Sequence, residues 1–69
     1  MDSDLRFAVI GRSESEPTLF HLTTTAARAE ILRARREETT GAPCFVVSLD
    51  AWRVDPLGAL RAAEAARFG

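Results

Sequence analysis

Neither a disulfide bond nor a structural metal ion can stabilise the fold of this chain. In 69 residues, Cys44 is the only cysteine and His21 the only histidine, so neither an internal disulfide nor a Cys/His zinc site can form. Because a domain of this length buries a small core, we expect its stability to depend on tight packing or on a second chain. The chain also carries no strong chemical motif, and we predict neither a metal site nor a cofactor.

Three short segments have the apolar pattern of β-strands. Residues 5–11 (LRFAVIG) are largely apolar on both sides of an extended chain, which predicts a central strand. Residues 18–22 (TLFHL) form a second strand, and the polar stretch 11–17 (GRSESEP) predicts that a long loop joins the two as a hairpin. Residues 43–49 (PCFVVSL) contain a continuous apolar run, as expected for a strand covered on both faces or at an interface.

Two segments have the signals of helices. The first follows a run of threonines, of which Thr23 or Thr24 can serve as the N-cap, and it ends at Gly41. The second begins at Asp55 and Pro56, whose order matches an N-cap followed by the first helical position, and it runs to about residue 68. Residues 50–54 are predicted to connect the third strand to this helix.

The order β-β-α-β-α predicts a small α+β domain that spans residues 1–69, with residues 1–4 flexible. We expect a three-stranded, mostly antiparallel sheet in the order 2-1-3, because hairpin strands are neighbours and the third strand can lie beside the first. Both helices are expected to pack on one face of this sheet.

The first helix separates its arginines into two sets when it is projected at 100° per residue. The predicted buried face consists of Ala27, Ile31, Leu32 and Ala34. The opposite face carries Arg33 and Arg36 among glutamates at the spacing of surface ion pairs, and we expect this face to be solvated. The two glutamates at that spacing from Arg33 are Glu30 and Glu37.

Arg28 and Arg35 border the predicted buried face, and two interpretations stay open. Their stems can cover the core while their guanidinium groups reach water. Alternatively, the two arginines form a fork that faces a partner protein or an anion. His21, Thr23 and Thr24 precede the same helix and are candidates for binding an anion near its N-terminus.

Trp52 and Arg53 are also candidate partner-binding residues. The tryptophan can either close the core between strand and helix or act as an exposed contact beside an arginine, as at many interfaces. The last helix carries small residues along one arc and larger apolar residues along the other, which favours a homodimer formed through this C-terminal helix. The small residues are Gly58, Ala59, Ala62, Ala63 and Ala66.

The charge and the residues available for chemistry restrict the function classes. All nine basic residues are arginine and the net charge is −1, so no segment has the basic excess that drives phosphate-backbone binding. We interpret the bias toward arginine and alanine as the mark of a GC-rich bacterial or phage genome. The spacing of His21 and Cys44 does not indicate a catalytic pair, and we predict that the chain is not an enzyme.

We expect a small non-enzymatic protein-interaction module, either a subunit, an adaptor or an inhibitor, that binds a partner protein of unknown identity. Nucleic-acid binding through the arginine-rich first helix is the alternative function. No membrane-spanning run and no signal peptide are visible, and with a free cysteine this favours the cytoplasm.

Overall fold

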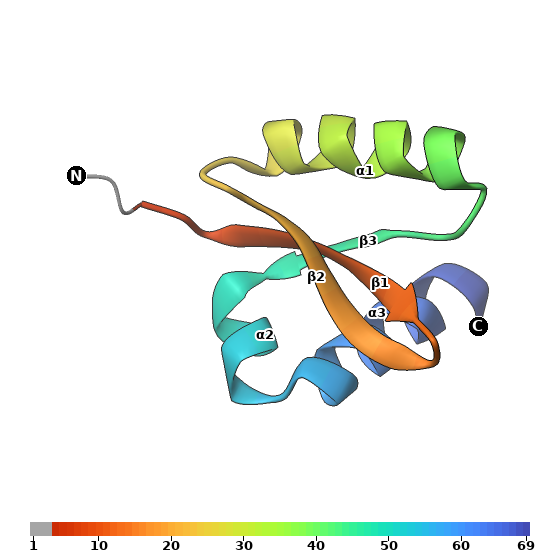
Figure 1. The fold of residues 1–69 in the computed structure, drawn as a ribbon. Coiled ribbons are helices and arrows are strands. Elements are labelled where there is room, and N and C mark those ends of the chain that lie inside the picture. The colour runs from red at the N-terminus through yellow and green to blue at the C-terminus, as the bar shows by residue number, and fades with distance from the viewer. Residues whose placement is uncertain (1–3) are drawn as a thin grey trace.

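The three strands form one antiparallel sheet in the order β2-β1-β3, as the sequence predicts (Figure 1). A computed structural model describes residues 4–69, so the predicted flexibility of residues 1–3 lies outside the described residues. The predicted α+β class is confirmed, and the element bounds are β1 Phe7–Ser13, β2 Glu16–Thr23, α1 Ala26–Thr40, β3 Phe45–Ser48, α2 Leu49–Val54 and α3 Pro56–Phe68.

The helices cover both faces of the sheet, whereas we expected them on one face. Figure 1 shows α1 on one side and α2 with α3 on the other. The reason is visible in β1, where Ala8, Val9 and Ile10 are all fully buried and therefore need cover on opposite faces. The α2–α3 face buries Ala8, Ile10, Phe45, Leu49 and Leu60, and the α1 face buries Val9, Ala29 and Cys44.

The hairpin between β1 and β2 is tighter than predicted. The strands extend through the polar stretch until Ser13 pairs with Glu16, which leaves a turn of two residues, Glu14 and Ser15. Both turn residues have positive φ, 54° and 72°, as a type I′ hairpin turn requires. We predicted a longer loop because the usual glycine or asparagine signal for this turn is absent.

A bulge interrupts β2 opposite β1. Val9 pairs with His21 while Ile10 pairs with Leu19, so Phe20 is the extra residue. Because of the bulge, Phe20 packs against the α1-side core rather than alternating to the other face. The bulge therefore gives α1 an aromatic surface on the edge strand.

Helix α1 begins one or two residues later than predicted, since we expected Thr23 or Thr24 as its N-cap, and it buries a largely different face. Thr25 is the N-cap, since its hydroxyl accepts a hydrogen bond from the Arg28 amide, and Gly41 ends the helix at φ 76° as expected. The predicted buried face was wrong for three of its four residues: Ala27, Ile31 and Ala34 are exposed, and only Leu32 packs on the core. The residues that face the sheet are Ala29, Leu32, Arg33, Arg36 and Glu37, of which only Ala29 is fully buried.

The segment that we predicted as a connector is a short helix, α2. The Ser48 hydroxyl caps it by accepting a hydrogen bond from the Ala51 amide. Asp55 then caps α3 as predicted, with Pro56 at the start and Phe68 as the last helical residue. Helix α3 turns Ala59 and Leu60 into the core.

Candidate functional site

A groove between β2 and α1 gathers most of the residues that the sequence singled out for binding. It consists of two hollows of about 270 Å³ and about 500 Å³, which share His21 and Leu32. We call it the α1–β2 groove. Its lining residues are Leu5, His21, Leu22, Thr23, Thr24, Thr25, Arg28, Leu32, Arg35, Arg36, Thr39 and Thr40.

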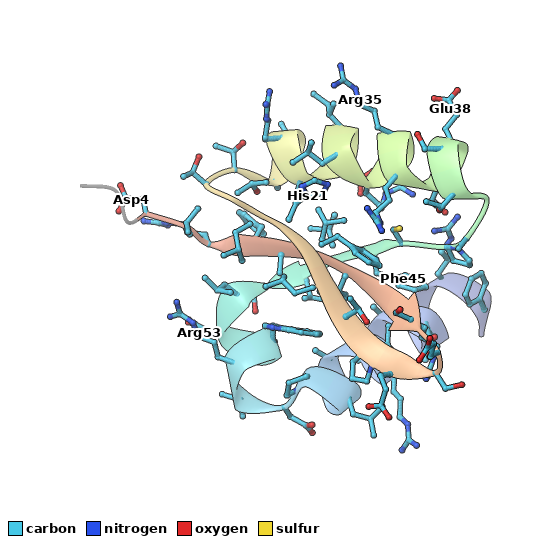
Figure 2. The ribbon with its side chains drawn as sticks, viewed as in Figure 1. Asp4, His21, Arg35, Glu38, Phe45 and Arg53 are labelled. Atoms are coloured by element: carbon cyan, nitrogen blue, oxygen red, sulfur yellow. The ribbon has the colours of Figure 1, made fainter. Side chains whose placement is uncertain are left out.

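The bulged edge strand and the helix that crosses it together form this groove. His21 lies between β2 and α1, as Figure 2 shows, because its cross-strand partner Val9 faces the α1 side. Leu22 pairs with Ala8, which faces the α2–α3 side, so the apolar side chain that both hollows share is Leu32 of α1. The groove thus has apolar side chains within a polar and basic rim.

Arg28 and Arg35 are both exposed on α1, and Figure 2 shows Arg35 directed away from the sheet. Within residues 4–69, neither arginine forms an ion pair. Their stems do not cover the core, as one of our two interpretations required. The side of α1 that faces the core carries Ala29 and Leu32 instead. Their guanidinium groups are therefore open to a ligand, whereas the idea that they bind a partner stays a prediction.

Arg36 and Arg33 both have contacts within the fold, and the sequence led us to expect only those of Arg33. The Arg36 guanidinium lies 3.6 Å from the centre of the Phe20 ring, which holds α1 against the bulge in β2 through a cation–π contact. Arg33 does pair with Glu30 and Glu37, as predicted. Both arginines are half-buried, so the prediction that they lie on a solvated face was wrong.

The threonines at the start of α1 differ in what they can offer an anion. Thr23 is buried and its hydroxyl donates to the Thr25 carbonyl oxygen at 3.0 Å, which uses it to shape the turn. Thr24 is exposed at the rim, while the Thr25 hydroxyl is engaged with the Arg28 amide. Of the two threonines proposed for anion binding, Thr24 is thus the more accessible.

Trp52 and Arg53 lie on the other face of the sheet, in α2. Trp52 is half-buried against the core that Ala8, Ile10 and Leu60 form, as in the interpretation that it closes the core. Arg53 is exposed and points away from the body of the protein (Figure 2). The four predicted partner-binding residues therefore form two separate pairs, and only Arg28 and Arg35 adjoin a groove.

A charged network at the β3 edge joins the two helical layers, and the sequence did not predict it. Arg67 of α3 forms an ion pair with Glu37 of α1 at 2.7 Å and donates to the Cys44 carbonyl oxygen at 3.1 Å. Glu37 also pairs with Arg33, so one carboxylate serves two guanidinium groups. The hydrogen bond from Arg67, more than the charges of Arg67 and Arg33, holds the pKa of Glu37 below its ordinary value.

Beside this network lies a second open groove, which we call the β3 groove. It measures about 480 Å³ and is bounded by side chains from α1, β3 and α3. This groove could not be predicted from the sequence, because its lining residues come from three segments that are far apart in the chain. They are Glu30, Arg33, Cys44, Phe45, Val46, Ala63, Ala66 and Arg67.

Cys44 is not arranged as a nucleophile. Its thiol is buried and donates weakly to the Ala42 carbonyl oxygen at 3.8 Å, and burial raises the pKa of the thiol. Over residues 4–69, no three His, Cys, Asp or Glu side chains cluster as metal ligands. In the same range, no helix is long and apolar enough to span a membrane.

Comparisons with known proteins assign no family to the chain. No family model, curated protein or solved structure matches it. The α1–β2 groove is therefore the feature of the molecule that points to a function.

Proposed function

We propose that this chain is a small non-enzymatic protein-interaction module, acting as a subunit, adaptor or inhibitor, that binds a partner in the α1–β2 groove. The partner segment is acidic and carries apolar side chains. One observation carries the proposal: Arg28, Arg35, Arg36 and His21 lie along this groove, with Arg35 directed outward from it and Arg36 stacked on Phe20, while no carboxylate from residues 4–69 lines it.

The charge distribution supports an acidic partner rather than a neutral one. The chain has ten acidic residues, yet the carboxylates that form ion pairs, Glu30, Glu37 and Glu64, are engaged with arginines elsewhere. Guanidinium groups bind carboxylates in a bidentate geometry, so Arg28 and Arg35 suit aspartate or glutamate side chains. Leu32, which lines both hollows, then adds affinity through burial of the partner's apolar groups.

Nucleic-acid binding is the weaker alternative for the same surface. Of the four arginines on α1, Arg33 pairs with glutamates and Arg36 stacks on Phe20, which leaves two for phosphate groups. Two phosphate contacts supply little of the electrostatic free energy on which nucleic-acid binding depends. Trp52 is half-buried against the core, which reduces the ring surface that a base could stack on.

A selection from a random peptide library tests the proposal without knowledge of the natural partner. We expect the native chain to enrich peptides that combine aspartate or glutamate with leucine, isoleucine or phenylalanine. The variant Arg28→Ala/Arg35→Ala should bind these peptides about tenfold more weakly, because two charge-assisted contacts are lost. Arg53→Ala/Arg61→Ala removes the same charge from the other layer of the fold and is the matched control.

Two results would refute this function. The first is enrichment of basic or uncharged peptides, and the second is equal binding by both double variants. An oligonucleotide that binds more tightly than the peptides, with an affinity that falls steeply with salt, would favour the alternative. The proposal places the chain in a reducing compartment such as the bacterial cytoplasm, where the free Cys44 thiol persists.

A further inference from the structure

We propose that His21 takes up a proton when the acidic partner segment binds in the α1–β2 groove, so that the complex tightens as the pH falls from 7.5 to 5.5. The proposal rests on the proposed function, because it assigns the residue through which pH controls binding at that same site. No covalent bond between heavy atoms changes. The proton comes from the solvent, and the imidazole becomes an imidazolium beside a carboxylate of the partner.

The bulge in β2 places His21 in the groove. Neighbouring side chains of a regular strand alternate between the two faces of a sheet, but here Phe20 and His21 both lie on the α1 side. Phe20 packs under the Arg36 guanidinium, whereas His21 lines both hollows and lies between β2 and α1 (Figure 2). Among residues 4–69, His21 is therefore the titratable side chain that the two hollows share.

The ring nitrogens of His21 are open to a ligand. Within residues 4–69, His21 takes part in no side-chain hydrogen bond and in no ion pair. In the same range, no buried side-chain nitrogen or oxygen lacks a hydrogen-bond partner, so both nitrogens of the ring reach the solvent in the groove. A protonated imidazole donates from both nitrogens, which suits the oxygens of a carboxylate.

The charged side chains that α1 directs along the groove are all cationic. Arg28 lines the same hollow as the N-terminal end of the helix, and Arg35 and Arg36 line the other. His21 thus lies in both hollows together with three guanidinium groups. An acidic segment that binds these arginines brings its carboxylates close to the imidazole as well.

The other elements around His21 bring no carboxylate into the groove. β1 pairs with it through the apolar Val9, and the N-terminal segment contributes Leu5. Asp4 and Arg6 flank Leu5 without lining either hollow, and Figure 2 shows Asp4 far from His21. The acidic residue of β2, Glu16, lies at the hairpin end of the strand, opposite Ser13. For residues 4–69, the first carboxylate that His21 meets in the groove is therefore one that the partner supplies.

Proton uptake sets the direction of the pH dependence. Histidine changes its charge between about pH 5 and 8, whereas arginine stays charged and glutamate stays ionised above about pH 5.5. A carboxylate within hydrogen-bond reach favours the charged imidazole, so the complex holds more protons than the separated partners. An equilibrium that takes up protons shifts toward the complex as the pH falls. We expect the affinity to rise at least about threefold between pH 7.5 and pH 5.5.

Titration calorimetry with a twelve-residue peptide of alternating glutamate and leucine tests the proposal. Measurements at pH 7.5, 6.5 and 5.5, each in two buffers with different heats of ionisation, give both the affinity and the number of protons taken up. The native chain should take up part of one proton at pH 6.5, whereas His21→Asn should take up none and lose the extra affinity at low pH. Arg28→Ala/Arg35→Ala is the matched control, and it should bind more weakly at every pH while it keeps the pH dependence.

NMR of the native protein provides a second readout that needs no substitution. His21 is the only histidine of the chain, so its ring protons are identified without further assignment. At pH 6.5 they should move toward the position of the charged ring as the peptide is added. A peptide that binds in the groove without proton uptake, or with equal uptake in His21→Asn, would overturn this proposal and leave the proposed function standing. A peptide that does not bind at all would overturn both.

Discussion

Arg67 and Glu37 form an ion pair, 2.7 Å between Nη2 and Oε1, that joins α3 to α1 around the β3 edge of the sheet. The two helices cover opposite faces, so this contact links layers that share no other ion pair among residues 4–69. Arg67 also donates to the Cys44 carbonyl oxygen. One side chain thus holds both helical layers and the start of β3.

Removing this guanidinium should destabilise the fold modestly. We expect Arg67→Met to lower the free energy of unfolding by about 1 kcal/mol, because a partly exposed ion pair and one hydrogen bond are lost while the apolar stem is kept. Urea denaturation measures the change. The control is Arg61→Met, at an exposed position on the same helix. An equal loss of stability in both variants would mean that the contacts of Arg67 do not stabilise the fold.

Stability should also fall in acid because of Glu37. The hydrogen bond from Arg67 lowers the pKa of Glu37 in the folded state below its ordinary value of 4.5. A lowered folded-state pKa contributes stability above the unfolded-state pKa, and this contribution is lost as pH falls below about 4.5 through the folded-state pKa.

Thermal unfolding between pH 7 and pH 2.5 checks this effect. Glu37→Gln should be less stable than the native chain at pH 7 and should lose less stability in acid. Glu38→Gln changes an exposed neighbour that points away from the sheet, and we expect it to follow the native curve. Parallel curves for all three proteins would show that Glu37 has no part in the acid sensitivity.

The two-residue hairpin turn can be improved. Glu14 and Ser15 adopt positive φ, a region in which a side chain costs about 1 kcal/mol, so Glu14→Asn/Ser15→Gly should raise the free energy of unfolding by about 1–2 kcal/mol. Calorimetry should record a higher Tm. Glu14→Ala/Ser15→Ala keeps both Cβ atoms and should bring no gain, and a similar rise in Tm for this variant would contradict a conformational cause.

Cys44 should react slowly in the folded protein. Its thiol is 1% exposed and burial raises its pKa, so both access and the thiolate fraction are low. We expect alkylation by iodoacetamide at pH 8 to be at least about tenfold slower in buffer than in denaturing urea. Comparable rates in the two solutions would mean that the α1-side core opens readily.

The strands and the helix ends could be predicted from the sequence because the residue patterns that mark them are local. The apolar pattern of β1, the stop at Gly41 and the Asp55–Pro56 start of α3 all depend on neighbours in the chain, and all are observed. The hairpin turn was missed because Glu14 and Ser15 are unusual at positive φ, and only the pairing of the flanking strands reveals them.

The arrangement of the helices was harder to predict because α1 is held by unusual residues. Its one fully buried residue is Ala29, while Arg33 and Arg36 provide much of the cover through ion pairs and stacking. A hydrophobicity pattern assigns arginine to solvent, so it placed the wrong face inward. The apolar character of β1 on both faces was the better signal that two layers of helices were needed.

The candidate site was predicted in part. His21, Thr24, Arg28 and Arg35 come together along the α1–β2 groove, because the bulge and the cap of α1 are close in sequence. The β3 groove depends on α1, β3 and α3, and no local pattern connects Val46 with Arg67 before the chain folds.

Mapping the binding of an acidic peptide by NMR is the most direct measurement of the central claim. A twelve-residue peptide of alternating glutamate and leucine, added to labelled protein, should shift the amides of His21, Leu22 and Leu32. The matched lysine–leucine peptide should leave them unchanged. The variant Arg28→Glu/Arg35→Glu should bind the acidic peptide more than tenfold more weakly, because its two new carboxylates repel the peptide's glutamates. Shifts confined to other surfaces, or an unchanged affinity in this variant, would contradict the assignment of the α1–β2 groove as the partner site.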